Sequence, residues 1–355
     1  DAIDVPAADL NLEAHACTRV HVLPCIAGHV GADTAAVVLA SRPHTADDVR
    51  LVVDVGTNAE IVLAGNGRIL AASSPTGPAF EGAQVSAGQR ATPGAIERIR
   101  IDPDTGEPRF RVIGAEPWSD EPGFDEAVAD TGVTGICGSG IIEVVAELWL
   151  AGLMNADGVI GGPDTRPSRR LVADGRTLSY VLHDPDGGND SGLLVTQNDV
   201  RAIQLAKAAL YAGIRLLMDH LEVDEVDQIS LAGAFGSHID TVRATVLGLV
   251  PDCEPDRVAS IGNAAGAGAV IALLSAGART EIQEVVDRIE KIETALEPSF
   301  QAHFVDAMAI PHRTADYPRL STCITLPQRP AISTTGPERS GRRRRRAATG
   351  EESSA

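Results

Sequence analysis

A turn suited to binding phosphate follows the first strongly apolar segment of the chain. The Leu-Val-Val run at residues 51–53 ends on Asp54, and Gly56, Thr57 and Asn58 follow closely. Glycine lacks a Cβ, so backbone amides at such a turn can approach phosphate oxygens. A carboxylate beside phosphates suits Mg²⁺, which proteins hold largely through water molecules. Read alone, the segment also fits a plain hairpin turn that Asp54 opens with a hydrogen bond.

A second glycine loop, made of Gly138, Ser139 and Gly140, precedes an apolar stretch at residues 141–153 that we expect to be helical. Amides at the start of a helix lack partners within the helix, and the helix dipole favours an anion there. The loop therefore predicts a second phosphate contact. An ordinary helix cap at Ser139 is the alternative.

A third loop follows a late apolar strand, expected at residues 226–231. It contains Gly233, Ala234 and Gly236, and residues this small would let an adenine or a ribose lie against the backbone. Close packing of a strand on a helix is the alternative. A phosphate loop on a hairpin, a glycine loop opening a helix and a late nucleoside loop occur in this order in actin-like and sugar-kinase-like ATPases. The order predicts an α/β fold with two related lobes around a nucleotide cleft.

The strands around the first loop distinguish between two kinds of phosphate site. After the turn the chain returns as an apolar strand at residues 60–63, and Asn66-Gly67, a strong hairpin signal, leads into a third strand at 68–72. Three antiparallel strands make a meander. In a Rossmann dinucleotide fold the glycine loop leads into a helix instead. The sequence therefore disfavours a Rossmann dehydrogenase.

The remaining elements are expected from apolar periodicity and from capping residues. Thr196 and Asp199 are expected to cap a long amphipathic helix that runs to about Leu221. Expected strands lie at residues 19–26, 95–102, 109–114, 178–182 and 192–195, and expected helices at 31–41, 239–247, 262–275 and 281–296.

The composition limits what the chain can bind. A formal net charge of −19 and an aromatic content of 3% disfavour nucleic acid, which would be repelled and would find few stacking partners. No apolar run is long enough for a membrane span, and no signal peptide opens the chain. The five cysteines are scattered and form no Cys-x-x-Cys pair, which fits a reducing cytoplasm and speaks against an iron–sulfur cluster in this chain.

Several short blocks of the sequence resemble one family in particular. In this order they resemble the C-terminal ATPase domain of the reductive activators of corrinoid proteins, also called corrinoid activation or regeneration proteins. The resemblance covers residues 20–311. The blocks are residues 31–34, 53–63, 77–83, 135–140, 196–207, 232–236 and 262–269.

The resemblance implies an ATP-dependent protein of electron transfer that uses ATP and Mg²⁺. Members return an inactive cobalt(II) corrinoid to the cobalt(I) state that methyltransferases need, and ATP binding and hydrolysis drive this uphill step. Glu81 is the expected water-positioning residue, and Glu60, Asp33 and Asp199 compete for that role. The resemblance implies that Asp54 holds Mg²⁺ and that Asp54, Gly56, Thr57 and Asn58 hold the terminal phosphates. From the other lobe, Gly138, Ser139 and Gly140 are expected to contact the phosphates. Gly233, Ala234 and Gly236 are expected to border the adenosine.

The same resemblance sets the expected partners and domain organisation. The partners are a corrinoid protein of a methyltransferase system and an electron donor or upstream ferredoxin-like domain, and a homodimer is a further option. Full-length members carry an iron–sulfur cluster for which this chain has no domain or cysteines. The chain begins with Asp1 rather than Met, so an upstream region is expected. The expected divisions are a lead-in at residues 1–19, the ATPase domain at 20–311, a C-terminal extension at 312–330 and a disordered Arg-rich tail at 331–355.

Two other functions remain open at this point. A sugar or acyl kinase of the same superfold would need a catalytic aspartate facing an acceptor pocket, and the sequence offers no clear one. A nucleotide-binding interaction module without turnover would use closure of the lobes only to grip a partner.

Overall fold

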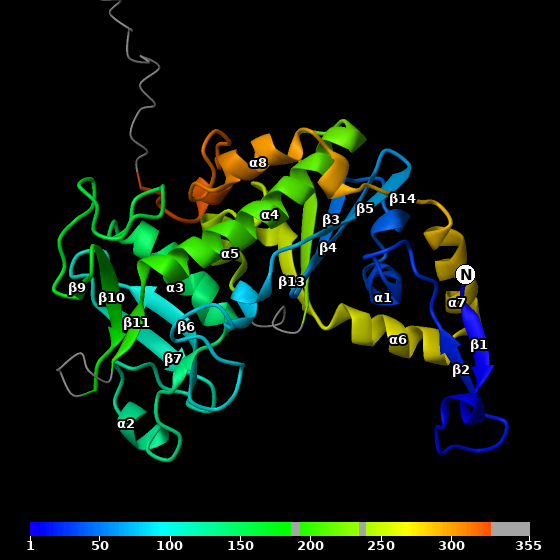
Figure 1. Cartoon of the computed structure of the whole chain (residues 1–355), viewed down its shortest axis with the longest axis horizontal. Helices are drawn as coiled ribbons and strands as arrows, with labels where there is room; N and C mark the ends of the chain where they lie inside the picture. Colours follow the sequence, from blue (N-terminus) through cyan, green and yellow to red (C-terminus); the bar gives the residue numbers. More distant parts are fainter. Residues whose placement is uncertain (186–191, 234–238, 328–355) are drawn as a thin grey trace, which may run out of the picture.

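The computed structural model describes residues 1–185, 192–233 and 239–327, and these form two lobes joined along one long helix. We call the part built on the six-stranded sheet lobe I and the part built on the two smaller three-stranded sheets lobe II. The long helix, α4 (Gln197–Leu221), runs across both lobes (Figure 1). None of the described helices combines the length and the apolar composition that crossing a bilayer requires.

Lobe I contains the predicted antiparallel meander at the centre of a mixed sheet. Its register pairs Asp54 with Glu60 across the first hairpin, which places both side chains on the same face. A late strand lies parallel to the first strand of the meander, so the loops at their carboxyl ends meet at one edge. Across the sheet the strands are β13 (Val258–Gly262), β12 (Gln228–Ala232), β3 (Arg50–Val55), β4 (Ala59–Gly65), β5 (Arg68–Ser74) and β14 (Ile289–Lys291).

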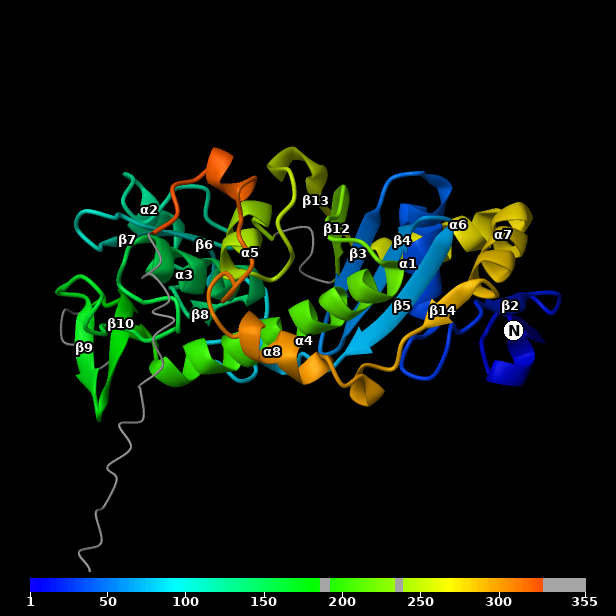
Figure 2. The ribbon, with the colours of Figure 1, turned by 90° about the horizontal axis from the view of Figure 1, so that it is seen from above.

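The two faces of this sheet are covered by different helices, as Figure 2 shows from above. Side chains alternate between the faces of a strand, so Val52 and Val62 pack with one group of helices while Leu51 and Ile61 pack on the other side with α4. The helices on the first face are α1 (Ala32–Ser41), α6 (Ala264–Leu274) and α7 (Ala276–Val286).

Lobe II is organised around a helix that is buried along almost its whole length, α3 (Gly138–Leu150). Its apolar side chains, such as Ile141 and Ile142, belong to the same core cluster as Leu51 of lobe I, so the core is continuous between the lobes. The other elements of this lobe are α2 (Phe124–Ala127), α5 (Thr241–Leu247), the sheet β7 (Pro108–Val112), β6 (Ala95–Ile101) and β8 (Gly135–Ile136), and the sheet β11 (Leu193–Val195), β10 (Thr177–His183) and β9 (Leu171–Asp174).

The helix α4 begins with the predicted cap and is held along its length. The Thr196 hydroxyl accepts a hydrogen bond from the Asp199 amide, and the Asp199 carboxylate accepts one from the Thr196 amide. Near its middle, the fully buried Lys207 donates to the carbonyls of Ala309 (2.5 Å) and Pro311 (2.7 Å). This clamp fixes the segment after α8 (Phe300–Ala307) against α4.

Three predicted elements differ from those observed, and two of them lie in the main sheet and in lobe II. The helix expected at residues 281–296 is wrong, because α7 ends at Val286 and β14 follows. β14 pairs in parallel with β5, so the sheet edge supplies hydrogen bonds that a continued helix would have made internally. The helix expected to start at residue 141 begins at Gly138, because the glycine loop itself forms the first turn.

The N-terminal part adds a small hairpin beside α7 (Figure 1), in which β1 (Ile3–Pro6) pairs with β2 (Arg19–Val22). The strand expected at residues 19–26 stops at Val22, shortly before Pro24, whose backbone has no amide to donate. The predicted domain boundaries at residues 19, 311 and 330 stay predictions.

Candidate nucleotide-binding cleft

A cavity of about 550 Å³ lies where the first and second glycine loops meet. The lining residues that were not predicted as site residues include four polar or charged ones, Asp33, Glu60, Gln89 and Arg90. The predicted residues that line it are Asp54, Gly56, Thr57, Asn58, Glu81 and Gly138.

The first loop is a tight turn between β3 and β4, and its backbone is held from behind. The amide of Gly56 donates to the carbonyl of Asn58 at 3.1 Å, so this amide is used within the turn. The hydroxyl of Thr76 donates to the carbonyls of Gly56 (3.0 Å) and Thr57 (3.1 Å). These bonds fix the turn, so the side chains of Thr57 and Asn58 are presented to the cavity from a rigid support.

Glu81 reaches the first loop from a separate segment. It ends the short 3₁₀ helix Pro78–Glu81, and its carboxylate accepts a hydrogen bond of 2.6 Å from the Thr57 hydroxyl. Glu81 is exposed, so this bond and not burial sets its position. The structure therefore brings the predicted water-positioning residue to the predicted phosphate loop.

Three carboxylates crowd the floor of the cleft. Asp54 and Glu60 are paired in register, and Asp33 lies in the first turn of α1. Burial, and secondly the charge of Asp33, raises the pKa of Asp54 above its ordinary value. Burial and then the charges of Asp33 and Asp54 raise the pKa of Glu60 to about 7. A cation at this position would relieve the repulsion that these shifts express.

The carboxylates fit Mg²⁺ in chemistry, since hard oxygen ligands are those it prefers. Among the described residues, however, no three His, Cys, Asp or Glu side chains are grouped so that they could hold a metal by themselves. A magnesium ion here would therefore need water and nucleotide phosphates for most of its ligands, which is its usual mode in phosphate sites.

The second glycine loop presents backbone rather than side chains to the cleft. Ser139 is buried and its hydroxyl donates to the carbonyl of Glu97 at 3.1 Å, so the side chain is committed to β6. A Cβ on Gly140 would lie 2.5 Å from the carbonyl oxygen of Ile96, so close packing requires glycine there. The ordinary cap at Ser139 is wrong, because Cys137 is the cap residue and no described side chain caps this helix.

Gly233 lies behind the first loop rather than in the cavity. Its φ of 122° and the 2.4 Å that would separate a Cβ from the carbonyl oxygen of Val55 both demand glycine. Its amide donates to the carbonyl of Gly262 at 3.1 Å. Ala234 and Gly236 lie outside the described residues, so the nucleoside site stays a prediction.

Asp199 has a structural role instead of a place in the cleft. It is 2% exposed, caps α4 and accepts hydrogen bonds from the amide and the hydroxyl of Ser86 at 2.8 and 3.0 Å. Of the carboxylates that competed to position water, those facing the cavity are Glu81, Glu60 and Asp33.

Sequence reasoning missed Arg90, which lines the cavity from the irregular segment after Glu81. The available signal was a Gly-Gln-Arg run between two glycine-containing loops. Nothing in that run alone distinguishes a cleft residue from a solvent-exposed one. Its place at the cavity depends on a parallel bridge between Gly88 and Ile136, which are distant in sequence.

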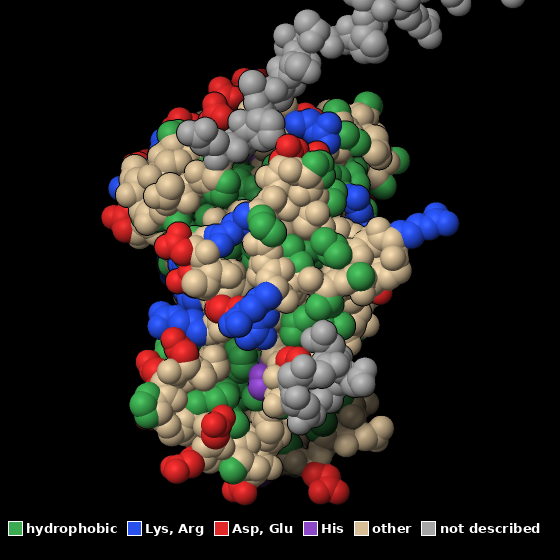
Figure 3. Space-filling view, turned by 90° about the vertical axis from the view of Figure 1, so that its left-hand side faces the viewer, with side chains coloured by type: hydrophobic (Ala, Val, Ile, Leu, Met, Phe, Trp, Pro, Cys, Tyr) green, Lys and Arg blue, Asp and Glu red, His purple; other side chains and the backbone are tan. Residues whose placement is uncertain are grey.

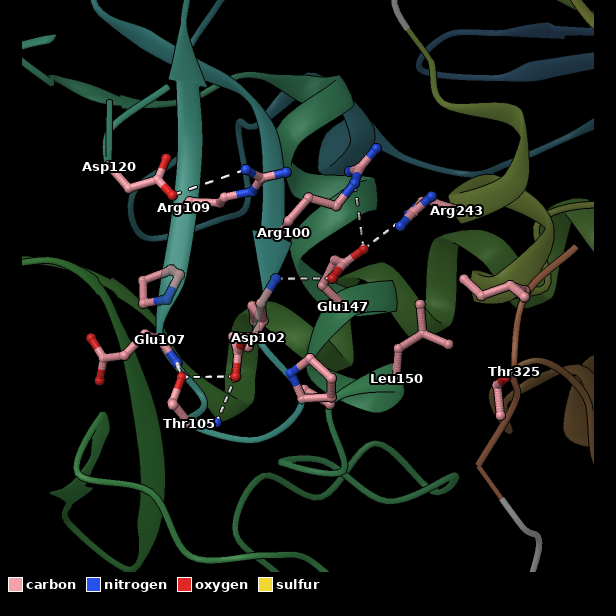
Figure 4. A pocket seen from close by; sticks show the side chains of 15 residues that line it. Arg100, Asp102, Thr105, Glu107, Arg109, Asp120, Glu147, Leu150, Arg243 and Thr325 are labelled. Carbon is pink, nitrogen blue, oxygen red and sulfur yellow. Dashed lines mark hydrogen bonds and ion pairs between the residues drawn. The ribbon is translucent and has the colours of Figure 1, made fainter. Parts of the chain in front are cut away.

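A larger cavity of about 880 Å³ lies in lobe II and contains none of the predicted residues. Figure 4 shows its wall, where Glu147 accepts hydrogen bonds from Arg243 at 2.9 Å and from the Ile101 amide at 2.9 Å. Arg100 in the same wall binds Asp240 at 2.7 Å. Its guanidinium groups already have carboxylate partners, and the glycine loops lie elsewhere. We therefore take the smaller cavity as the functional site, although it is not the largest.

The outer end of lobe II carries charges of both signs. Figure 3 faces this end and shows Lys and Arg side chains near its middle and acidic side chains toward its edges. This visible face is therefore not a uniformly basic surface.

Comparisons with known proteins agree with the geometry. Over residues 48–321 the sequence matches the family described as the C-terminal domain of RACo, the ASKHA domain. It is 36% identical over 314 residues to the corrinoid activation enzyme RamQ of Eubacterium limosum, covering 86% of this chain and 49% of the relative. It is 26% identical over 302 residues to the reductase of the Co(II) methylated amine-specific corrinoid protein of Methanosarcina barkeri, covering 82% and 51%.

A solved structure supports the same assignment. The reductive activator for corrinoid, iron–sulfur protein matches with a TM-score of 0.74 and 31% identity, over 87% of this chain and 47% of that chain. The chain spans about half the length of each of these three relatives. The predicted two-lobed α/β fold is confirmed, and the chain belongs to the family of RACo C-terminal ASKHA domains.

Proposed function

We propose that this chain binds MgATP in the cleft and that ATP hydrolysis there drives the reductive activation of a corrinoid protein from cobalt(II) to cobalt(I). The observation that carries the proposal is the meeting of two glycine loops, one from each lobe, with a set of carboxylates at one cavity. The corrinoid comes from the names of the relatives, which are a corrinoid activation enzyme, a corrinoid protein reductase and a reductive activator.

The residues divide the work of binding between the lobes. Asp54 would face the magnesium ion, which would neutralise phosphate charge when bound. The Asn58 side chain and the backbone amide of Thr57 would donate to the terminal phosphates, since the Thr57 hydroxyl proton is used by Glu81. The Gly138 amide would donate from the opposite side. Gly233, with Ala234 and Gly236, would border the adenosine.

Glu81 is our candidate for positioning the attacking water. The Thr57 hydroxyl holds its carboxylate at the phosphate loop, within the same cavity as the predicted phosphate contacts. In the hydrolytic step the water oxygen bonds to the terminal phosphorus, and the bond from that phosphorus to the bridging oxygen breaks. Glu81 accepts the proton of the water, and ADP and phosphate leave.

The electron would reach cobalt from an iron–sulfur carrier that is not part of this chain. One electron passes from the reduced carrier to the cobalt(II) corrinoid, which becomes cobalt(I). The proposed task of this chain is therefore to couple nucleotide turnover to the transfer.

The direct test is a titration of the purified chain with MgATP and with a cobalt(II) corrinoid protein, each alone and both together. We expect binding of MgATP, phosphate release, and tighter binding of one ligand when the other is present. Failure of both ligands to bind under every condition would overturn the proposal. ATP binding without phosphate release would favour the interaction module, and ADP release that depends on a polyol or a carboxylate would favour the kinase.

A matched pair of variants tests the role of Glu81. Glu81→Gln keeps the size of the side chain but removes the proton acceptor, so we expect ATP to bind with a kcat lowered about 10²-fold or more. Glu60→Gln serves as the comparison, since Glu60 also lines the cavity. A larger loss of kcat in Glu60→Gln than in Glu81→Gln would transfer the role to Glu60.

A further inference from the structure

Arg90 is the one cation among the described residues that line the cleft. Four carboxylates, those of Asp33, Asp54, Glu60 and Glu81, line the same cavity. ATP brings several more negative charges, and magnesium offsets only part of them. A positive side chain in this acidic lining would therefore reduce the repulsion that a bound phosphate meets. Within the described lining, Arg90 alone supplies one.

The position of Arg90 follows from a contact distant in sequence. Gly88 forms a parallel bridge with Ile136, the amide of Gln89 donates to the carbonyl of Ile136 at 2.9 Å, and the amide of Ile136 donates to the carbonyl of Ala87 at 2.8 Å. The two segments run side by side in the same direction. Two residues past the bridge, the first segment reaches Arg90 and the second reaches Gly138. Both residues line the cavity.

The guanidinium of Arg90 makes no ion pair within 4.0 Å to any described acidic residue, whereas the other cations of lobe II that lie near buried acids are paired. Arg98 and Arg100 bind Glu143 at 2.7 and 2.6 Å, and Arg243 binds Glu147 at 2.9 Å. Arg90 is exposed and lines the cavity together with Gly138, the first residue of α3. Its charge is thus available to a ligand, although carboxylates line the same space.

From these observations we propose that Arg90 contacts the terminal phosphate of the bound nucleotide and stabilises the charge that develops on it as the phosphate is transferred to water. The planar guanidinium is always charged and offers two parallel donors that match phosphate oxygens. Arg90 shares its cavity with the predicted phosphate residues Thr57, Asn58 and Gly138, so phosphate is the ligand group we expect it to meet. The inference rests on the proposed nucleotide site and adds a catalytic residue to it.

The test compares Arg90→Ala and Arg90→Lys with a control arginine. Arg176 is suitable, because it is exposed in the turn between β9 and β10 and forms no ion pair with a described residue. We measure ATP and ADP affinity by calorimetry, and phosphate release for kcat and KM. We expect Arg90→Ala to lower kcat by about 10³-fold, the lower range for an arginine of this type, and to weaken ATP binding while ADP binding stays unchanged.

Arg90→Lys keeps the charge but loses the paired donors, so a partial recovery of kcat is expected, and Arg176→Ala should match the unaltered chain. Equal kcat in Arg90→Ala and the unaltered chain would overturn the inference, as would equal weakening of ATP and ADP. If the unaltered chain binds neither nucleotide, the proposed function fails as a whole. If it binds and hydrolyses ATP but Arg90→Ala does so equally, only the role of Arg90 fails.

Discussion

The two glycine loops of the cleft are both predicted to bind phosphate, but they present different parts of their residues to it. The loop of lobe I is a hairpin turn that places a carboxylate, a hydroxyl and an amide side chain at the cavity. The loop of lobe II is the buried start of α3, where Ser139 and Gly140 face the core and only Gly138 lines the cavity.

The loop of lobe I therefore contributes side chains to the cleft, whereas the loop of lobe II contributes backbone. In lobe I a substitution alters what the cleft can bind, because the strands beneath hold the turn in place whatever its side chains are. In lobe II a substitution disturbs packing first, because the helix start is pressed against β6. Substitutions at matched positions of the two loops should therefore affect different measurements.

The largest effect is expected from Asp54→Ala in lobe I. Removing this carboxylate should weaken MgATP binding by about 2–5 kcal/mol, the range for truncating one partner of a buried charge pair. Its position at a strand end should leave the fold intact. Calorimetry with MgATP checks the first expectation and thermal unfolding the second. Asp47→Ala, at an exposed position, is the control, and unchanged affinity in Asp54→Ala would remove Asp54 from the site.

The next largest effect should be on stability, in lobe II. Gly140→Ala would press a Cβ against the Ile96 carbonyl, at 2.5 Å, and we expect a loss of about 1–3 kcal/mol in the free energy of unfolding. In Gly56→Ala the nearest atom to the new Cβ is the Asn58 carbonyl oxygen at 3.3 Å, so stability should change less and nucleotide affinity more. Urea unfolding and nucleotide titration of both variants measure the contrast. If both variants lost stability and nucleotide affinity to the same extent, the proposed difference between the two loops would be wrong.

A third prediction concerns pH and applies only to lobe I. The pKa of Glu60 is raised from 4.5 to about 7 in the folded chain, so the folded state binds more protons than the unfolded state between these values. Without ligand, this group should make the chain less stable as the pH rises from about 4.5 to about 7. Glu60→Gln should remove that part of the loss, and the exposed Glu116→Gln should not. Identical pH profiles for the unaltered chain and Glu60→Gln would contradict the prediction.

The smallest effect is expected from Thr57→Val, which removes one hydroxyl and keeps the shape of the side chain. The bond to Glu81 is lost, and exposed Glu81 can bind water instead, so we expect MgATP affinity to fall by about 0.5–1.5 kcal/mol. Phosphate release should slow as well, since Glu81 is no longer held. A normal rate with normal affinity would show that the Thr57–Glu81 bond is dispensable.

Features set by neighbouring residues could be predicted from the sequence. The β3–β4–β5 meander follows from alternating apolar residues and an Asn-Gly turn, and the start of α4 follows from Thr196 and Asp199. The order of the glycine loops was enough for the two-lobed fold. In each case the signal lies within a few residues of the element that it forms.

Features set by distant contacts could not be predicted in this way. The direction of the Ser139 side chain depends on the Glu97 carbonyl of β6, and the place of Arg90 depends on the bridge between Gly88 and Ile136. The strand β14 forms only because the edge of β5 is free to pair with it. Nothing near these residues in the sequence carries that information.

The long helix α4 has a mechanical consequence for the cleft. Its 25 residues span about 37 Å at 1.5 Å per residue, and it packs against β4 and β5 in lobe I and against β10 and α3 in lobe II. Asp199 at its first turn binds Ser86, which lies on the segment between Glu81 and Arg90. The first turn of α4 is therefore bonded to the segment 81–90, which carries both Glu81 and Arg90. Glu81 of that segment accepts a hydrogen bond from Thr57 of the first phosphate loop. A rotation of lobe I relative to α4 would therefore strain this bond.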